Sequence, residues 1–302
     1  MNAIAIDFGG TKIEGSIVTD KGKIIKTVRH PTEAAKGKKT VVDNVVGVIE
    51  QLKKDKAGKT VKGVGISMPG LIKDGVVIWG GGTLTCLDGL KFAALLKKKT
   101  GLDTYIENDA NCFALAEAVF GAGKNHGVVV GVIWGTGVGG GIVVDKKVFD
   151  GAYGGAGEFG HMVMDHNVRS GPACGCGQKA CLEMVSSGKN IERIYKERGG
   201  KIKGATVPQI YASKEPVARD TIKNAAYFMG LGLSYLVNTL NPDVIVLGGG
   251  VSKLPDDVYD VVRASTRHFA LKQLTKRLKI VRHKISDSAG TLGAAALVFE
   301  AR

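Results

Sequence analysis

The sequence predicts an α/β protein made of two similar halves, each with a mixed β-sheet covered by helices. In the first half, three strands come first, and strands then alternate with helices. After a weak break at residues 121–127, the pattern starts again with an apolar strand. Each half places a glycine-rich turn directly after such a strand, at residues 7–11 and 134–137. This repeat indicates duplicated domains that face one nucleotide.

The elements of the first half follow from apolar patterning and turn residues. Short apolar runs that end in glycine, or in the turn Asp20–Lys23, indicate strands and a hairpin. Apolar residues at helical spacing, namely Val42, Val45, Val46 and Ile49, indicate a helix. In chain order, we expect strands at 3–7, 13–19 and 24–29, a helix over 41–53, strands at 61–67 and 105–106, and a helix over 109–120.

The second half repeats this order with longer apolar segments. An apolar strand leads into a glycine loop and a hairpin partner, and a long helix then precedes another apolar strand. The expected elements are strands at 128–134 and 141–145, a helix over about 220–240, and a strand at 244–247 that ends in Gly248, Gly249 and Gly250.

Composition favours a cytoplasmic enzyme and excludes several other classes. Of 302 residues, 44% are hydrophobic and 23% are charged, which excludes a disordered or fibrous chain. The 44 glycines indicate backbone that approaches a ligand closely, and phosphate is the usual candidate. No apolar run is long enough for a membrane span, no secretory signal is recognised, and the five cysteines do not suggest extracellular bridges.

The net charge of +14 does not predict a nucleic-acid partner. A nucleic-acid binder concentrates basic residues beside aromatic stacking residues, whereas the lysine-rich runs at 53–62 and 97–99 contain no aromatic residue. We interpret these runs as solvated surface, with steering of an anionic substrate as the alternative.

The first glycine loop is suited to binding phosphate. Gly9 and Gly10 offer backbone N–H groups, while Thr11 and Lys12 add a hydroxyl and an ammonium group. Asp7, at the end of the preceding strand, could hold the Mg²⁺ that accompanies ATP. A tight hairpin with a capping aspartate is the alternative interpretation.

A second loop of the same kind, with Gly135, Thr136 and Gly137, favours a phosphate clamp over two unrelated hairpins. Neither loop is a P-loop, because the chain contains no Gly-x-x-x-x-Gly-Lys-Ser/Thr. The spacing of residues 135–140 fits a dinucleotide fingerprint, but the chain continues into a strand where that fold needs a helix.

Together these motifs resemble those of the ROK family (repressors, open reading frames and kinases), within the actin-like ATPase and hexokinase superfamily. Each motif alone is modest, but their order and spacing are specific, and they extend from residue 7 to about residue 296. The matching segments are residues 7–12, 68–70, 108–111, 135–141, 158–161, 174–176, 181–183, 248–251 and 290–295.

The resemblance implies a sugar kinase with two actin-like (ribonuclease H-like) domains and an active site in the interdomain cleft. The smaller domain would comprise residues 1–110 and 288–302, and the larger one residues 111–287 with a zinc-binding loop. ATP with Mg²⁺ would be the donor, held by both loops and Gly248–Gly250. The substrate would be a hexose of the glucose, fructose or N-acetylhexosamine class, phosphorylated at its primary 6-hydroxyl, and we expect a homodimer.

Asn108 and Asp109 lie between an expected strand and an alanine-rich helix. The local pattern alone favours Asp109 as a helix N-cap. The resemblance implies instead that Asp109 is the general base, because a sugar hydroxyl is a poor nucleophile until a carboxylate accepts its proton. Asn108 would bind a neighbouring sugar hydroxyl.

The resemblance implies further sugar contacts. Glu158 and His161 lie in or next to a glycine-rich stretch, and Glu183 follows the cysteines; surface charges on loops are the alternative. Gly70 belongs to the Pro-Gly turn, and Thr83 aligns where relatives carry a sugar-binding Asn. Because unpaired polar groups provide epimer selectivity, we expect Thr83 to give weaker and broader hexose use.

Cys174, Cys176 and Cys181 suggest a metal site, since three thiolates need only one further ligand. His161 would complete a closed, structural Cys₃His zinc site. A redox pair or plain buried thiols are the alternatives. Ala180 stands where family members usually carry Gly, which concerns the loop geometry and no ligand.

Three rival functions are weaker. The family's transcriptional repressors add an N-terminal helix-turn-helix module, and we expect none because the phosphate loop starts at residue 7. A sugar sensor without catalysis fits poorly with an intact base and both loops. A polyphosphate-dependent hexokinase would benefit from the +14 charge, but such relatives usually lack the cysteine cluster.

Overall fold

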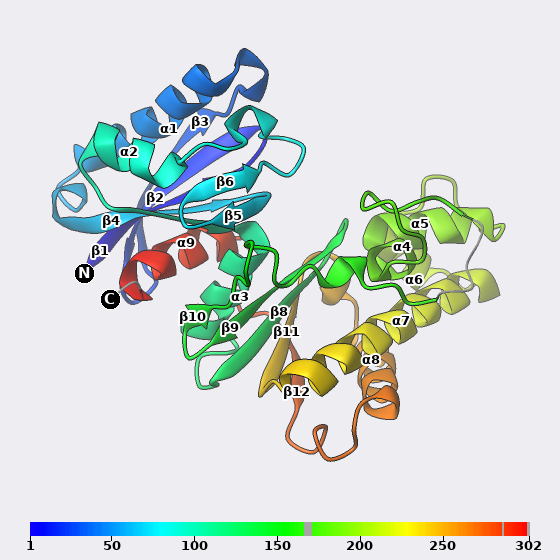
Figure 1. Ribbon diagram of the computed structural model, residues 1–302. Coiled ribbons are helices and arrows are strands. Elements are labelled where there is room, and N and C mark those ends of the chain that lie inside the picture. The colour runs from blue at the N-terminus through cyan, green and yellow to red at the C-terminus, as the bar shows by residue number, and fades with distance from the viewer. Residues whose placement is uncertain (166–170, 286, 301–302) are drawn as a thin grey trace. The chain divides into compact units, whose positions relative to one another are not determined.

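The computed structural model describes residues 1–165, 171–285 and 287–300, which form two compact units (Figure 1). Unit 1 comprises residues 1–127, 141–157 and 284–302. Unit 2 comprises residues 128–140 and 158–283. The domain limits expected from the sequence, near residues 110 and 288, differ from this division and remain a prediction.

Unit 1 contains a five-stranded mixed sheet in the order β3-β2-β1-β4-β7. β1, β2 and β3 are antiparallel neighbours, while β4 runs parallel to both β1 and β7. The carboxyl ends of β1, β4 and β7 therefore meet at one edge, where Asp7 pairs with Ser67 and Met68 pairs with Asn108. The strands are β1 (Asn2–Phe8), β2 (Lys12–Thr19), β3 (Ile24–Pro31), β4 (Val61–Met68) and β7 (Thr104–Asn108), with a separate hairpin of β5 (Leu71–Lys73) and β6 (Val76–Trp79).

Helices cover both faces of this sheet, with α1 and α2 on one side and α9 on the other (Figure 1). Ile4 and Ile66 of the sheet are fully buried in one apolar cluster with Val45 and Ile49 of α1 and Phe92 of α2. Burial of such side chains supplies most of the driving force for this layer. The helices are α1 (Lys38–Lys53), α2 (Phe92–Thr100), α3 (Asp109–Val119) and α9 (Ala289–Glu300).

Helix α9 lies so close to β4 and α3 that only glycine fits at two contact points. A Cβ atom on Gly65 of β4 would lie 1.7 Å from the carbonyl oxygen of Ala294. A Cβ atom on Gly293 of α9 would lie 2.0 Å from the carbonyl oxygen of Cys112 in α3. The glycines are therefore required by close backbone approach, and they fix where α9 begins relative to β1.

The second sheet has the strand order β10-β9-β8-β11-β12. Within it, β11 runs parallel to both β8 and β12, so the turns that follow β8 and β11 lie at the same edge. β10 pairs antiparallel with β9. The strands are β8 (Val128–Trp134), β9 (Val138–Val144), β10 (Lys147–Val148), β11 (Val244–Gly248) and β12 (Lys279–Arg282).

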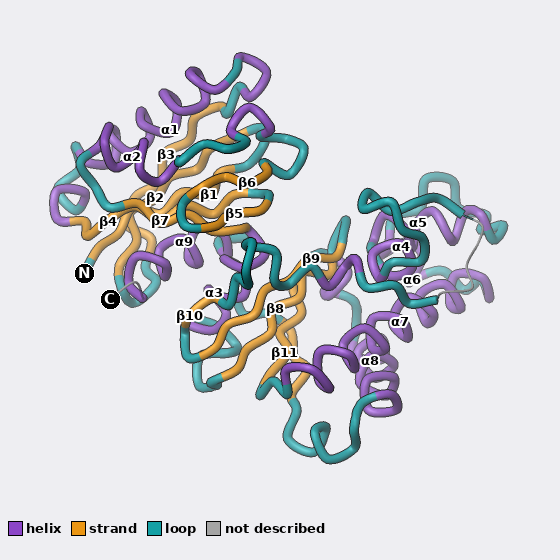
Figure 2. Tube along the Cα trace, viewed as in Figure 1, coloured by secondary structure: helices purple, strands orange, loops and turns teal. Residues whose placement is uncertain are grey.

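The helices of unit 2 are organised around the long helix α7 (Figure 2). α8 packs along α7, and α4, α5 and α6 contact it as well. Despite the 25 residues of α7, no helix in the described part of the chain is both long and apolar enough to cross a bilayer. The helices are α4 (Leu182–Ser186), α5 (Gly188–Glu197), α6 (Val207–Ala212), α7 (Pro216–Leu240) and α8 (Asp256–Phe269).

The predicted α/β class, with mixed sheets flanked by helices, is confirmed. The strands and helices expected from the sequence are present with small shifts at their ends. One boundary was wrong: the second glycine loop ends at Gly137, because β9 begins at Val138 and includes Gly139–Gly141. The sequence patterning gave no bounds for the strands β5, β6, β10 and β12 or for the helices α2, α4, α5, α6 and α8, most of which are short.

The close packing of α9 gives a stability prediction. Gly293→Ala should lower the free energy of unfolding by about 1–3 kcal/mol, as overpacking of a core typically does. Gly47→Ala in α1 is the matched control, because its nearest neighbour would be His30 at 3.5 Å. There, the better helix propensity of alanine should stabilise by up to about 1 kcal/mol. Urea unfolding of both variants measures the difference, and two equally stable variants would contradict the packing argument.

Candidate active site

The first glycine loop connects β1 to β2, and its own backbone bonds hold its shape. The Gly9 amide donates to the Lys12 carbonyl at 2.9 Å, and Thr32 Oγ1 donates to the Gly9 carbonyl at 2.6 Å. Gly10, Thr11 and Lys12 are exposed. The loop therefore presents backbone, hydroxyl and ammonium groups to solvent, as an anion site requires.

Asp7 lies directly before this loop and next to the start of α9. A Cβ atom on Gly290 would lie 3.0 Å from Asp7 Oδ1, so the helix backbone approaches the carboxyl group. Burial, followed by the negative charges of Glu14 and Asp109, raises the pKa of Asp7, while the Lys12 ammonium lowers it. Asp7 and Asp109 are thus near enough to interact, and both are available to a ligand that carries positive charge.

Asn108, and not Asp109, caps helix α3. Asn108 Oδ1 accepts hydrogen bonds from the backbone amides of Ala110 at 2.8 Å and Asn111 at 3.2 Å. Its Nδ2 donates to the carbonyl oxygen of Gly70 at 2.9 Å. The local pattern assigned the cap role to Asp109, but Asn108 fills it. The Asp109 carboxyl group is therefore not required as the helix cap.

Asp109 is exposed at the first position of α3. Its Oδ1 accepts a hydrogen bond from the Ala110 amide at 2.9 Å. Desolvation by the surrounding protein raises the pKa of Asp109, and the amides of Ala110 and of Asp109 itself oppose that shift. A carboxylate with a raised pKa accepts a proton more readily, which suits a general base.

Glu107 is a site residue that sequence reasoning missed. Its side chain is 8% exposed, and Oε1 accepts from the Asn108 amide at 2.7 Å and from Asn111 Nδ2 at 3.0 Å. Burial is the main cause that raises its pKa to about 6; the two hydrogen bonds and the charge of Lys73 lower it, and the charge of Asp150 raises it. An acidic residue in an apolar strand, directly before Asn108, was the available signal.

Thr83 lies beside the first glycine loop. A Cβ atom on Gly10 would be 3.2 Å from Thr83 Cβ, so the threonine side chain packs against the loop backbone. Gly70 meets Asn108 through its carbonyl oxygen, as described above. The structure thus brings Thr83 to the phosphate loop and Gly70 to Asn108 within unit 1.

The second glycine loop, residues 135–137, and the glycines that follow β11, residues 248–250, lie together in unit 2. The Gly135 amide donates to the Gly137 carbonyl at 3.0 Å, and the Gly188 amide at the start of α5 donates to the Gly135 carbonyl at 2.7 Å. Gly249 has φ +85°, and a Cβ atom there would lie 2.6 Å from the Trp134 carbonyl oxygen. Side chains are therefore excluded where the two turns meet.

A cavity of ≈ 330 Å³ opens beside these turns, entirely within unit 2. Its glycine and threonine walls were expected from the sequence, but its other walls come from α5 and α6 and carry no recognisable motif. The lining residues are Gly135, Thr136, Gly188, Lys189, Glu192, Val207, Pro208, Gly250 and Val251.

Glu183, expected as a sugar contact, supports the second glycine loop. Its Oε2 accepts a hydrogen bond from the Val138 amide at 3.0 Å. A Cβ atom on Gly137 would lie 2.5 Å from that same oxygen. The carboxylate of Glu183 therefore fixes the point at which the loop enters β9.

The four expected metal ligands are brought together. The ligand atoms of His161, Cys174, Cys176 and Cys181 all lie within 4.8 Å of one another. Cys174 Sγ is 3.3 Å from His161 Nδ1, and Cys176 Sγ is 3.6 Å from Cys181 Sγ. His161 Nε2 is 3.6 Å from Glu158 Oε2, the place of a carboxylate that orients a metal-bound histidine. Three thiolates and one imidazole suit zinc.

Ala180 precedes the last of these ligands and has φ +55°. An L-residue with a Cβ atom pays about 1–2 kcal/mol for this left-handed conformation, whereas glycine adopts it freely. A glycine would therefore fit this position without that cost.

The candidate residues fall into two sets that belong to different units. Unit 1 holds the expected base, the first glycine loop, and the expected sugar contacts Gly70, Thr83 and Asn108. Unit 2 holds the second glycine loop, the glycines after β11, the expected metal ligands, and the carboxylates Glu158 and Glu183. The first set is Asp7, Gly9, Gly10, Thr11, Lys12, Gly70, Thr83, Asn108 and Asp109; the second is Gly135, Thr136, Gly137, Glu158, His161, Cys174, Cys176, Cys181, Glu183, Gly248, Gly249 and Gly250.

Comparison with known proteins accounts for this combination of fold and motifs. The model of the ROK family matches residues 3–301, and the chain belongs to that family. A glucokinase of Thermotoga maritima is 29% identical over 99% of this chain and 98% of the relative. An N-acetyl-D-glucosamine kinase of Mannheimia succiniciproducens is 33% identical over 96% of this chain and 97% of the relative.

Solved structures agree over the same length. A ROK hexokinase from Thermus thermophilus superposes with a TM-score of 0.86 at 29% identity, covering 100% of this chain and 99% of that one. A ROK glucokinase from Streptomyces griseus, in complex with glucose and AMPPNP, has a TM-score of 0.76 at 29% identity, with 99% and 100% covered.

The raised pKa of Glu107 gives a pH prediction. A folded-state pKa of about 6, against an ordinary value of 4.5, means that folding favours the protonated acid. The associated stability is present below pH 4.5 and is lost as the pH rises through 6, a total of about 2 kcal/mol. Glu107→Gln cannot ionise, so its stability relative to the parent should increase by about 1.2 kcal/mol between pH 5 and pH 8, because the first part of the loss has already occurred at pH 5. Chemical denaturation at both pH values measures this, and a constant difference would contradict it.

Proposed function

We propose that this protein transfers the γ-phosphoryl group of ATP to the primary 6-hydroxyl of a hexose, with Asp109 as general base. Membership of the ROK family and the named sugar kinases among its relatives support the carbohydrate-kinase class. The neighbour that binds glucose and AMPPNP supports a sugar acceptor and an adenine nucleotide donor. The choice among glucose, fructose and N-acetylhexosamines is left to a substrate panel.

The observation that carries the proposal is the exposed carboxyl group of Asp109 at the start of a capped helix. Because Asn108 provides the cap, Asp109 bonds through its carboxyl group to the amides of Ala110 and of Asp109 itself, and we assign its exposed carboxyl group to a sugar hydroxyl. As the hydroxyl oxygen attacks the γ-phosphorus, its proton passes to Asp109. The new O–P bond forms while the bond to the β-phosphate oxygen breaks, and ADP leaves.

The donor would lie against the glycine segments. The backbone amides of Gly10, Thr136 and Gly137 suit phosphate oxygens, since those of Gly9 and Gly135 bond within their own loops, and the cavity walled by Gly250 and Val251 suits the nucleoside. Asp7 would hold Mg²⁺, which supplies positive charge against the phosphates when bound. The raised pKa of Asp7, caused first by burial and then by neighbouring acids, fits a carboxyl group that a cation would stabilise.

The proposed sugar-binding residues differ in the neighbours that they contact within their own unit. Asn108 and Gly70 support each other beside Asp109, and Thr83 lies against the first loop. Glu158 and His161 lie near one another in unit 2, where we assign them to the sugar as well. Glu183 has a demonstrated loop contact, so its contribution would include holding the second glycine loop in shape.

Asp109→Asn tests the base. The amide keeps the shape but cannot accept the proton, so kcat should fall about 10²–10⁴-fold while hexose binding persists. A coupled assay for ADP with ATP, Mg²⁺ and a hexose panel measures turnover. Asp103→Asn is the matched control, because Asp103 is exposed and pairs with Lys97 in the same unit. Near-parental kcat in the Asp109 variant would rule out its role as base.

The cysteine cluster is proposed to hold one structural Zn²⁺. Cys176→Ser removes a thiolate and should lower bound zinc to background, reduce the melting temperature and weaken hexose binding together. Cys86→Ser changes a cysteine outside the cluster and should keep the metal. Elemental analysis of protein purified without chelator gives the zinc content; parental protein with no zinc would refute this site.

A further inference from the structure

The segment that follows β11 forms a wall of the cavity proposed for the nucleoside. Gly250 and Val251 line that cavity, and a Cβ atom on Gly250 would meet no other atom within 4 Å. Gly250–Lys253 forms a short turn in which the Lys253 amide donates to the Gly250 carbonyl at 3.3 Å and the Leu254 amide to the Val251 carbonyl at 3.1 Å. These bonds are local; the buried side chains of Val251 and Leu254 anchor the turn in unit 2, and its carbonyl groups are held by further polar contacts.

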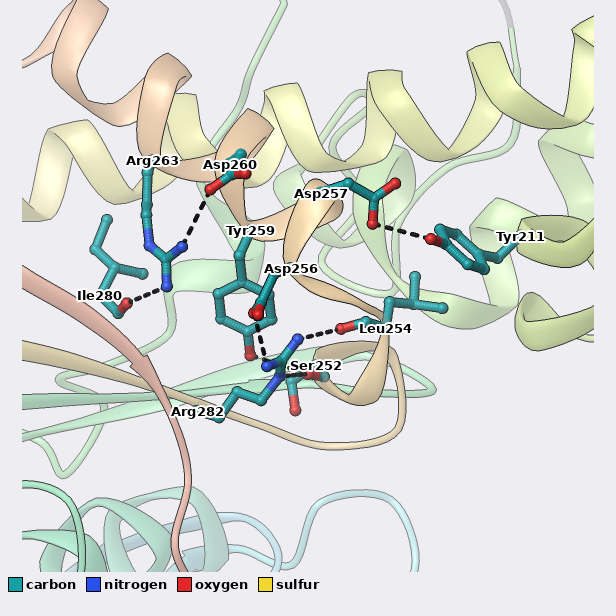
Figure 3. Close-up of polar contacts among 10 residues, drawn as sticks. All are labelled: Tyr211, Ser252, Leu254, Asp256, Asp257, Tyr259, Asp260, Arg263, Ile280 and Arg282. Carbon is teal, nitrogen blue, oxygen red and sulfur yellow. Dashed lines mark hydrogen bonds and ion pairs between the residues drawn. The ribbon is translucent and has the colours of Figure 1, made fainter.

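Arg282, the last residue of β12, holds this turn from behind (Figure 3). Its Nη2 donates to the Leu254 carbonyl at 2.6 Å, and its Nε donates to the Ser252 carbonyl at 3.4 Å. Its Nη1 donates to Asp256 Oδ1 at 2.8 Å, at the start of α8. One rigid guanidinium group thus joins the end of a strand, the glycine turn and the next helix.

Tyr259 of α8 completes the arrangement. Its ring is fully buried, and its hydroxyl donates to the Ser252 carbonyl at 2.9 Å. The Arg282 guanidinium carbon lies 4.4 Å from the centre of that ring, the geometry of a cation–π contact. Tyr259 therefore orients Arg282 and shares one of its acceptors, as Figure 3 shows.

We propose that Arg282 and Tyr259 are positioning residues for the adenine nucleotide, acting through the turn at Gly250 and Val251. The inference rests on the proposed function, because it assigns that cavity to the donor. Neither side chain lines the cavity. They act by fixing the carbonyl groups of Ser252, which directly follows the cavity wall, and of Leu254, two residues further on.

The exposure of the ion pair indicates that Arg282 affects binding more than the overall stability of the fold. The ion pair with Asp256 is solvent-exposed, with 39% and 74% of the two side chains accessible, and such pairs stabilise a fold little. The carbonyl contacts, in contrast, act on a turn whose backbone must keep its shape to accept a ligand. Small shifts of that turn would change the cavity while leaving the buried core in place.

Arg263 provides a matched control on the same ring. Its guanidinium carbon lies 5.3 Å from the centre of Tyr259, so it shares the cation–π contact. It donates to Asp260 Oδ1 and to the Ile280 carbonyl, both at 3.3 Å, and among the described residues it makes no hydrogen bond to the turn at residues 250–254 (Figure 3). The two arginines therefore differ in the feature on which the inference depends, because Arg282 bonds to the carbonyl groups of Ser252 and Leu254 and Arg263 does not.

The test compares Arg282→Met, Arg282→Lys and Arg263→Met by equilibrium titration with MgATP. Arg282→Met should raise the Kd for ATP roughly tenfold, since it removes two donors to backbone carbonyl groups. Arg282→Lys retains a charge but not the planar fork and should recover part of the affinity. Arg263→Met should bind ATP within about twofold of the parent, on the same scale of hydrogen-bond energies. In turnover assays, KM for ATP should rise in the Arg282 variants, with kcat and the hexose KM nearly unchanged.

The possible outcomes separate this inference from the proposed function. Parental ATP affinity in Arg282→Met overturns the inference, and so does an equal loss in Arg263→Met, which would indicate a general effect of the ring stack. Parental protein that binds no ATP overturns the proposed function together with the inference. If Arg282→Met does not fold, Tyr259→Phe serves instead: it removes only the hydroxyl bond to Ser252 and should raise the Kd for ATP at least twofold, and an unchanged Kd overturns the inference.

Discussion

Contact between backbones without intervening side chains is the constraint on which unit 1 depends. Gly65 and Gly293 allow α9 to lie directly on β4 and against α3. Because α9 then begins beside Asp7, the same packing brings a helix start to the end of β1. The approach of α9 to Asp7 thus depends on two residues in the core that have no side chain.

Unit 2 solves a similar problem in a different way. Its glycine turns after β8 and β11 also need backbone free of side chains, but polar side chains hold them in place. Glu183 bonds to the residue at which β9 begins, and Arg282 bonds to the turn after Gly250. Apolar packing gives the sheet its position, and a few charged groups then bond to the backbone of the turns that follow it.

Much of the fold and part of the site could be predicted from the sequence. Apolar runs followed by glycine identify β1, β8 and β11, because strand and turn are both local in the chain. The pair Asn108–Asp109 at a strand-to-helix boundary was also recognisable, although the structure gives the cap to Asn108. These features depend on neighbours within a few residues, which is what a pattern can register.

The remaining features depend on contacts between distant segments. Lys189, Glu192 and Pro208 line the cavity in unit 2 only because α5 and α6 pack beside the glycine turns. Arg282 meets Leu254 across 28 residues, and nothing in its own strand distinguishes it from other surface arginines. Domain limits and the effect of a buried acid such as Glu107 likewise follow from packing, which one sequence does not display.

The distance in sequence between β1 and α9 has a consequence for synthesis of the protein. β1 ends at Phe8, whereas the helix that covers one face of its sheet starts at Ala289, so α9 cannot bury that face until about 280 further residues have been synthesised. At about 5–20 residues per second, the interval is roughly 15–60 s. Most of unit 2 lies between these segments and can fold first. During that time the N-terminal strands therefore lack the apolar cover that α9 provides.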